Sequence, residues 1–206
     1  MLRWEVQDAI EEYLNKMEYN YEKTCDEDDP DIINYDLNLC INSKVYAVDV
    51  RMEVTENYVS SMVCFPIKIC EDRLAEVNEF ITRINHDWLL LKKFILGYET
   101  HNLAIVWRHF LGKDNSFNAD LAENMLYLTV SWMEELSDDI LEILLAGVSG
   151  KDQYLKTRTR LVKSCEDDEE PDADSNANFD VDSDAEGGVD TEDTDFGKPM
   201  RFIIRL

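Results

Sequence analysis

Residues 31–55, DIINYDLNLCINSKVYAVDVRMEVT, decide the fold class, because apolar side chains recur in them at every second position. These side chains share one side of an extended chain, in the order Ile33, Tyr35, Leu37, Leu39 and Ile41, then Tyr46, Val48, Val50, Met52 and Val54. A period of two is typical of strands with one buried and one solvated face. Asn42-Ser43 between the two runs suits a tight hairpin, so the stretch predicts an antiparallel pair.

Further elements follow on both sides of this pair. Residues 2–18 have the apolar spacing of an amphipathic helix, and the acidic link CDEDDPD follows at 25–31. A third strand begins at Tyr58 and ends near Pro66, since proline cannot donate to a central ladder. Helical spacing returns over 74–88. Two strand-like runs then occupy 89–98 and 102–111, with a turn over 97–102.

The last part of the folded region is predicted as two helices. The spacing of apolar residues from Ala119 to Leu136 indicates a long helix, and Ser137 is a natural N-cap for a short one ending at Gly147. The predicted order is α-βββ-α-ββ-αα. It indicates an α+β fold, a two-layer sandwich with helices on one face of an antiparallel sheet.

Charge and composition divide the chain into four parts. Residues 1–150 form the α+β domain, and 151–164 form a basic helical extension or linker. Residues 165–197 are predicted to be a disordered acidic tail, because a segment so rich in carboxylates cannot bury enough apolar surface to offset its ordering entropy. The chain closes with an apolar and basic segment, KPMRFIIRL, at 198–206.

The charge balance limits the class of partner. The chain has 45 acidic and 20 basic side chains, with a formal net charge of −25. Nucleic acids and anionic membranes bind proteins that neutralise their charge, so neither is an expected ligand. Five cysteines without a C-x-x-C pattern read as free thiols in a reducing compartment. With no signal peptide or membrane span in the sequence, a cytoplasmic location is predicted.

Three segments carry a resemblance to a known family. They are LAEVNEFITRINHDWLL at 74–90, KKFILGYETHNLAIVWRHFL at 92–111, and NMLYLTVSWMEELSDDILEILLAG at 124–147. Together with the order of elements they resemble the YbjN-like proteins, whose fold is similar to that of type III secretion chaperones. The resemblance implies a non-enzymatic protein-binding module, regulatory or chaperone-like and often dimeric. It also implies a client segment that lies extended along the domain, and it carries over no catalytic residues.

The residues themselves do not form a catalytic or cofactor pattern. His86, His101 and His109 are scattered, without the i,i+4 or cysteine spacing of a metal site. His109 shares a predicted strand face with Ile105 and Trp107, which favours a structural role. Motifs such as G-x-S-x-G and the phosphate-binding loop are absent from the sequence, so no enzyme activity and no cofactor are expected.

One acidic stretch keeps a second class of function open. DSDAEGGVDTED at 182–193 fits a twelve-residue calcium loop, with Gly187 at the sharp turn. Its oxygen ligands would be Asp182, Asp184, Glu186 and Asp193. Its flanks do not read as helices, and a plain acidic linker accounts for the same residues. The alternative function is therefore a calcium-responsive protein, which calcium calorimetry separates from a plain interaction module.

The C-terminal segment is the candidate partner-binding element. Apolar side chains exposed at a terminus cost free energy in water, and β-branched residues favour an extended backbone. The residues concerned are Phe202, Ile203, Ile204 and Leu206. Two interpretations remain open: the segment docks in cis on its own domain, or it is presented in trans to another protein. The main hypothesis is a protein-interaction module, with a protein client and a homodimer as the expected partners.

Overall fold

The computed structural model describes residues 3–26, 29–112 and 116–167. The chain divides into two compact units, Met1–Thr157 and Arg158–Leu206. All strands and the first three helices below belong to the first unit. The described residues contain no helix that is long and apolar enough to cross a membrane.

The first unit is built on an antiparallel sheet of six strands in the order β1-β2-β3-β4-β6-β5. The strands are β1 Tyr21–Cys25, β2 Ile33–Cys40, β3 Ala47–Val54, β4 Tyr58–Cys64, β5 Lys92–Leu96 and β6 Leu103–Phe110. Because side chains alternate across each strand, the sheet has an inner and an outer face.

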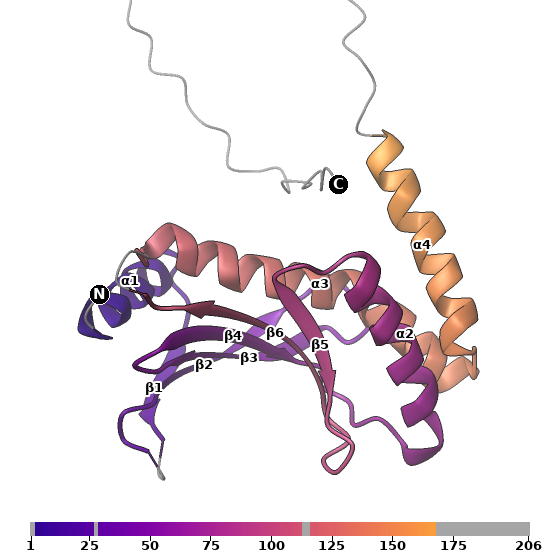
Figure 1. The fold of residues 1–206 in the computed structure, drawn as a ribbon, viewed down its shortest axis with the longest axis horizontal. Helices are drawn as coiled ribbons and strands as arrows, with labels where there is room; N and C mark the ends of the chain where they lie inside the picture. Colours follow the sequence, from indigo (N-terminus) through magenta and orange to yellow (C-terminus); the bar gives the residue numbers. More distant parts are fainter. Residues whose placement is uncertain (1–2, 27–28, 113–115, 168–206) are drawn as a thin grey trace, which may run out of the picture. The chain divides into compact units, whose positions relative to one another are not determined.

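Helices cover the inner face (Figure 1). They are α1 Arg3–Lys16, α2 Leu74–Asp87 and α3 Ala119–Ala146, and a short 3-10 turn, η1 Glu71–Arg73, leads into α2. Helix α3 packs against β4 and β6, α2 against β5, and α1 against β3. The predicted α+β two-layer architecture is confirmed.

The core lies between the inner face and these helices. One row of inward side chains in register crosses the sheet, through Leu37, Val50, Val63, Ile105 and Phe94. Every member of this row is at most 4% exposed. Phe80 of α2 and Met133 of α3 are fully buried above the sheet. The period-two pattern of the sequence therefore marked the buried side of β2 and β3 correctly.

The order of elements gains one strand that the sequence analysis missed. β1 pairs with β2 along its whole length, from Tyr21 opposite Leu37 to Cys25 opposite Ile33. Its sequence, YEKTC, is short and polar, so it lacks the apolar alternation that predicts a strand. Pairing with β2, rather than its own apolar pattern, places it in the sheet.

The hairpin between β2 and β3 is longer than predicted. The amide of Ile41 donates to the carbonyl of Tyr46 at 2.7 Å, so residues 42–45 form the loop rather than Asn42-Ser43 alone. Tyr46 has a φ of 63° and is 69% exposed. The prediction that Tyr46 shares the buried face of β3 is wrong, because the chain is still turning at this residue.

The two helices predicted after Ala119 are one continuous helix, α3. Asn118 caps its start, where the side-chain oxygen accepts from the amide of Leu121 at 2.9 Å. Ser137 is not an N-cap: its buried hydroxyl donates to the carbonyl of Met133 within the same helix. The buried face continues past Ser137 through Ile140, and the helix ends at Gly147 in the left-handed conformation, φ 70°.

Helix α4, Gly150–Asp167, includes the predicted extension at 151–164 and also residues 165–167, which had been predicted as tail. The compact first unit reaches Thr157, within α4. Ser149 caps the start of this helix, where its hydroxyl accepts from the amide of Asp152 at 3.1 Å. Residues 168–206 lie outside the described residues, so the disorder predicted for the acidic tail stays a prediction.

A buried hydroxyl pair joins the sheet to α3. The hydroxyls of Ser61 and Thr129 lie 2.8 Å apart with both residues 0% exposed, and Thr129 donates to the carbonyl of Met125 at 2.7 Å. Thr129→Val removes the partner of a buried hydroxyl and is expected to cost about 1–3 kcal/mol. Addition of Ser61→Ala should recover a large part of that loss, because neither partner is then unsatisfied. A double-mutant cycle by urea unfolding measures this; additive losses would contradict it.

Candidate functional site

The outer face of the sheet is the candidate functional site. No described helix of the first unit lies over it (Figure 1). Strand register places one row of outward residues across the whole sheet, in the order Glu22, Asp36, Arg51, Met62, Val106 and Lys93. A second row runs beside it through Asn38, Asp49, Cys64, Ala104 and Ile95. We call this surface the open face.

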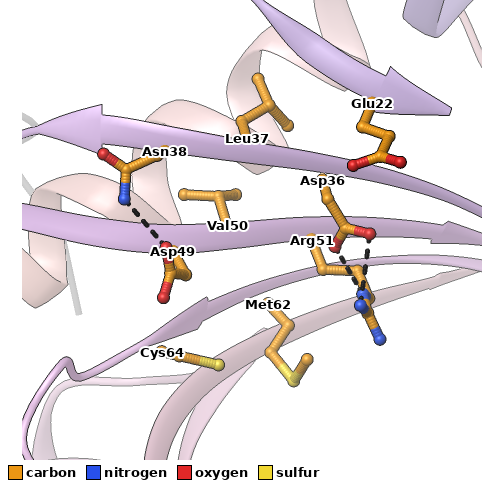
Figure 2. Close-up of a pocket in the computed structure, with 9 residues that line it drawn as sticks. All are labelled: Glu22, Asp36, Leu37, Asn38, Asp49, Val50, Arg51, Met62 and Cys64. Carbon is orange, nitrogen blue, oxygen red and sulfur yellow. Dashed lines mark hydrogen bonds and ion pairs between the residues drawn. The ribbon is translucent and has the colours of Figure 1, made fainter.

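The half of the open face over β1, β2 and β3 is polar and acidic. Arg51 forms a two-point ion pair with Asp36, through Nε–Oδ1 at 2.7 Å and Nη2–Oδ2 at 3.2 Å (Figure 2). The hydrogen bond to Asp36 raises the pKa of Arg51. Asn38 Nδ2 donates to Asp49 Oδ1 at 2.8 Å, and Glu22 has no side-chain partner among the described residues. With Asp36 neutralised by Arg51, the carboxylates of Glu22 and Asp49 give this half its net negative charge.

The half over β4, β6 and β5 is largely apolar. Met62, Ala104 and Val106 are half-buried, and Ile95 is 53% exposed. At its rim the guanidinium of Arg108 lies 4.3 Å from the centre of the Tyr58 ring. Apolar side chains on the helix-free face of a sheet leave apolar surface in contact with water, which is a feature of interaction sites.

A hollow of about 510 Å³ joins the two halves. Its walls are Glu22, Asp36, Leu37, Asn38, Asp49, Val50, Arg51, Met62 and Cys64. Figure 2 shows the ion pair and the Asn38–Asp49 bond on one side of the hollow, with Met62 and Cys64 on the other. A bound segment would therefore meet hydrogen-bonding and charged groups along one flank and apolar atoms along the other.

The Cys64 thiol in the hollow is not activated as a nucleophile. Burial, followed by the nearby charge of Asp49, raises the pKa of the Cys64 thiol. The thiol is therefore protonated at neutral pH, and the thiolate is the nucleophilic form. Among residues 3–26, 29–112 and 116–167, no group of three or more histidine, cysteine or acidic side chains is placed to hold a metal ion.

The histidines are as scattered in space as in the sequence. His86 is exposed and lies 2.6 Å from Asp87 through Nδ1, whereas His101 sits in the β5–β6 turn with a φ of 59°. His109 lies on the inner face, with its ring 6.0 Å from that of Phe117. Its buried Nε2 atom has no hydrogen-bond partner in the described part of the chain.

The other predicted site residues lie outside the described residues. These are the partner-binding residues Phe202, Ile203, Ile204 and Leu206, and the calcium candidates Asp182, Asp184, Glu186 and Asp193. The structure adds a site that the sequence analysis did not name. Its signal was present in YVSSMVC and LAIVWRHF, which have apolar residues on both sides of the strand, whereas β2 and β3 alternate with polar residues.

Comparisons with protein-family models, curated proteins and solved structures find no match to this chain. The open face is therefore interpreted from its own residues.

Lys92, on β5, is the basis of a pH prediction. Its Nζ lies 5.6 Å from the ring centre of Trp132 and 6.0 Å from that of Trp107, and burial lowers its pKa to about 8. An unfolded lysine has a pKa of about 10.4, so between about pH 8 and pH 10 the unfolded chain holds a proton that the folded chain has lost. Stability contributed at this site therefore rises with pH across that window.

The measurement is the free energy of unfolding of the chain and of Lys92→Met at several pH values. The difference, natural chain minus variant, is expected to increase from pH 8 to pH 10. Parallel curves would show that Lys92 keeps an ordinary pKa in the folded state.

Proposed function

We propose that this chain is a non-enzymatic protein-interaction module, regulatory or chaperone-like, that binds an extended segment of a protein partner on the open face. The observation that carries the proposal is the apolar half of that face, formed by Met62, Ala104, Val106 and the exposed Ile95. Burial of apolar surface is the main favourable term in protein association, at roughly 25 cal/mol per Å². The proposed resemblance to the YbjN-like proteins and secretion chaperones agrees with this kind of partner.

The shape and polarity of the face favour an extended segment. The hollow crosses β1 to β4, from carboxylates on β1, β2 and β3 to Met62 on β4, and the apolar side chains of β6 lie next to Met62 in register. Neighbouring strands are about 4.8 Å apart, so the carboxylates on β3 and the apolar side chains on β6 are about 10 Å apart. One extended segment with its side chains spans that distance. The preferred partner segment therefore combines basic and aliphatic residues.

Binding of random peptides to the full chain tests the proposal. A displayed peptide library is selected against the natural chain, and the affinities of the selected peptides are then measured for Ile95→Asp. A charge in the middle of a buried apolar contact is expected to weaken binding by about tenfold or more. Leu145→Asp is the matched control, because Leu145 is an exposed aliphatic residue at the end of α3.

The acidic half gives a second readout. Peptides containing arginine or lysine should bind the double variant Glu22→Gln with Asp49→Asn more weakly and with less dependence on salt, because this variant removes two negative charges.

Selected peptides that bind Ile95→Asp as tightly as the natural chain would place the binding surface elsewhere. A second copy of this chain as the occupant would appear as a change of mass in solution that Ile95→Asp abolishes.

A further inference from the structure

The last seven residues of the C-terminal segment, 200–206, have the alternation that the open face complements. In an extended conformation, successive side chains point to opposite sides. Met200, Phe202, Ile204 and Leu206 therefore share one side of the segment, and Arg201, Ile203 and Arg205 share the other. One side is wholly apolar, and the other carries two guanidinium groups.

Each property of the segment has a counterpart on the open face. Met62 and Val106 are neighbours in register and offer apolar surface, with Ile95 beyond them. Two carboxylates across the hollow are available to guanidinium groups. Glu22 has no side-chain partner among the described residues, and Asp49 accepts a single hydrogen bond, from Asn38.

The acidic stretch next to the segment cannot replace the sheet as its partner. Residues 164–197 carry fifteen carboxylates and no basic side chain, so they can attract Arg201 and Arg205. They hold few aliphatic residues, and burial of Phe202 and Ile204 requires an apolar surface. The open face supplies both that surface and carboxylates.

Chain length permits the contact. Helix α4 ends at Asp167, and thirty residues, 168–197, separate it from Lys198. Thirty residues span at most about 100 Å, whereas a unit of this size has a radius of gyration of about 15 Å. Attachment to the same chain also gives the segment a local concentration of roughly millimolar order, so weak contacts suffice.

We propose that residues 198–206 occupy the open face in cis and compete there with the protein partner. This inference rests on the proposed function, and it makes the C-terminal segment an internal regulator of the site. A partner must displace the segment, so its apparent affinity for the intact chain is lower than its affinity for the vacant face.

Photocrosslinking in the full chain tests the contact. Phe202 is replaced by p-benzoylphenylalanine, the chain is irradiated, and the crosslinked peptides are mapped by mass spectrometry. Crosslinks are expected to fall on β4 and β6, around Met62 and Val106. An equal mixture of ¹⁴N and ¹⁵N chains should give crosslinks within one isotope only, since the contact is in cis. Leu145→Asp should leave the yield unchanged, and Ile95→Asp or Arg201→Glu with Arg205→Glu should lower it.

Crosslinks spread over the helices, or crosslinked products that join a ¹⁴N chain to a ¹⁵N chain, would overturn the proposal.

The full-length variant Phe202→Glu with Ile204→Glu distinguishes cis competition from the proposed partner-binding function. Peptides selected on the open face should bind this variant about tenfold more tightly than the natural chain, because the competitor is removed. Equal affinity would refute cis competition while leaving the open face a binding site. Crosslinks on the face without any selected peptide binding there would instead refute the partner-binding function.

Discussion

Tyr35→Ala is expected to destabilise the chain by about 3–5 kcal/mol, the usual cost of removing a large buried aromatic ring. Tyr35 is 0% exposed on the inner face of β2. Its hydroxyl donates to Glu11 Oε1 at 3.0 Å, and Lys23 of β1 donates to the same oxygen at 2.6 Å. The ring of Tyr21 lies 5.8 Å from that of Tyr35. Removal of Tyr35 therefore leaves a cavity and loosens the contacts that join α1 and β1 to β2.

Tyr35→Phe separates the ring from its hydroxyl. It should cost only about 1 kcal/mol, because Glu11 keeps its bond from Lys23 and the ring still fills its space. Urea unfolding of both variants, followed by tryptophan fluorescence, gives the two free energies. Similar losses for the two substitutions would mean that the hydroxyl, rather than packing of the ring, determines the stability of this region.

Gly150→Ala is expected to lower the free energy of unfolding by about 2–3 kcal/mol, in the upper part of the range for overpacked sites. A Cβ atom at this position would lie 2.0 Å from the carbonyl oxygen of Glu76 and 3.1 Å from the amide nitrogen of Phe80. Both atoms belong to the backbone of α2, which cannot rotate away. The amide of Gly150 also donates to Glu76 Oε2 at 2.8 Å, so the start of α4 is fixed against α2.

Gly97→Ala is the control for this prediction. Its Cβ would meet the Thr100 hydroxyl at 2.4 Å, the end of a side chain that can rotate. We expect a loss below about 1 kcal/mol there, because the Thr100 hydroxyl can rotate away. Alanine also lowers the conformational entropy of the unfolded chain relative to glycine, which offsets part of the loss. Thermal unfolding of both variants provides the comparison. A Gly150→Ala chain as stable as Gly97→Ala would show that α4 does not need its close approach to α2.

The parts of the fold that sequence predicted well are those whose local pattern and tertiary environment agree. Strands β2 and β3 alternate strictly, and burial of Val48, Val50 and Met52 follows that alternation. The sequence predicted that a helix ends at Gly147. In the structure this residue has a φ of 70°, in the left-handed region that favours glycine. In these places the local sequence pattern and the tertiary packing favour the same conformation.

Predictions failed where a local signal was overridden. Serine is a favoured N-cap residue, but apolar residues on both sides of Ser137 are buried, so α3 continues through it. The Ser137 hydroxyl donates a hydrogen bond to the carbonyl of Met133 in the same helix. β1 has no apolar pattern, and its place depends on pairing with β2 and on the contact of Lys23 with α1. Neither partner can be read from the five residues of β1 themselves.

The sequence by itself determined the fold class, the buried sides of β2 and β3, and the basic and apolar character of residues 198–206, because each of these depends on local period or composition. Only the tertiary structure decided where the candidate site lies. Glu22, Asp49, Met62 and Ile95 come from four different strands, and they share one surface only because the register aligns those strands and helices cover the opposite side. Strand order and register are set by contacts between residues distant in sequence, so a local sequence pattern does not predict them.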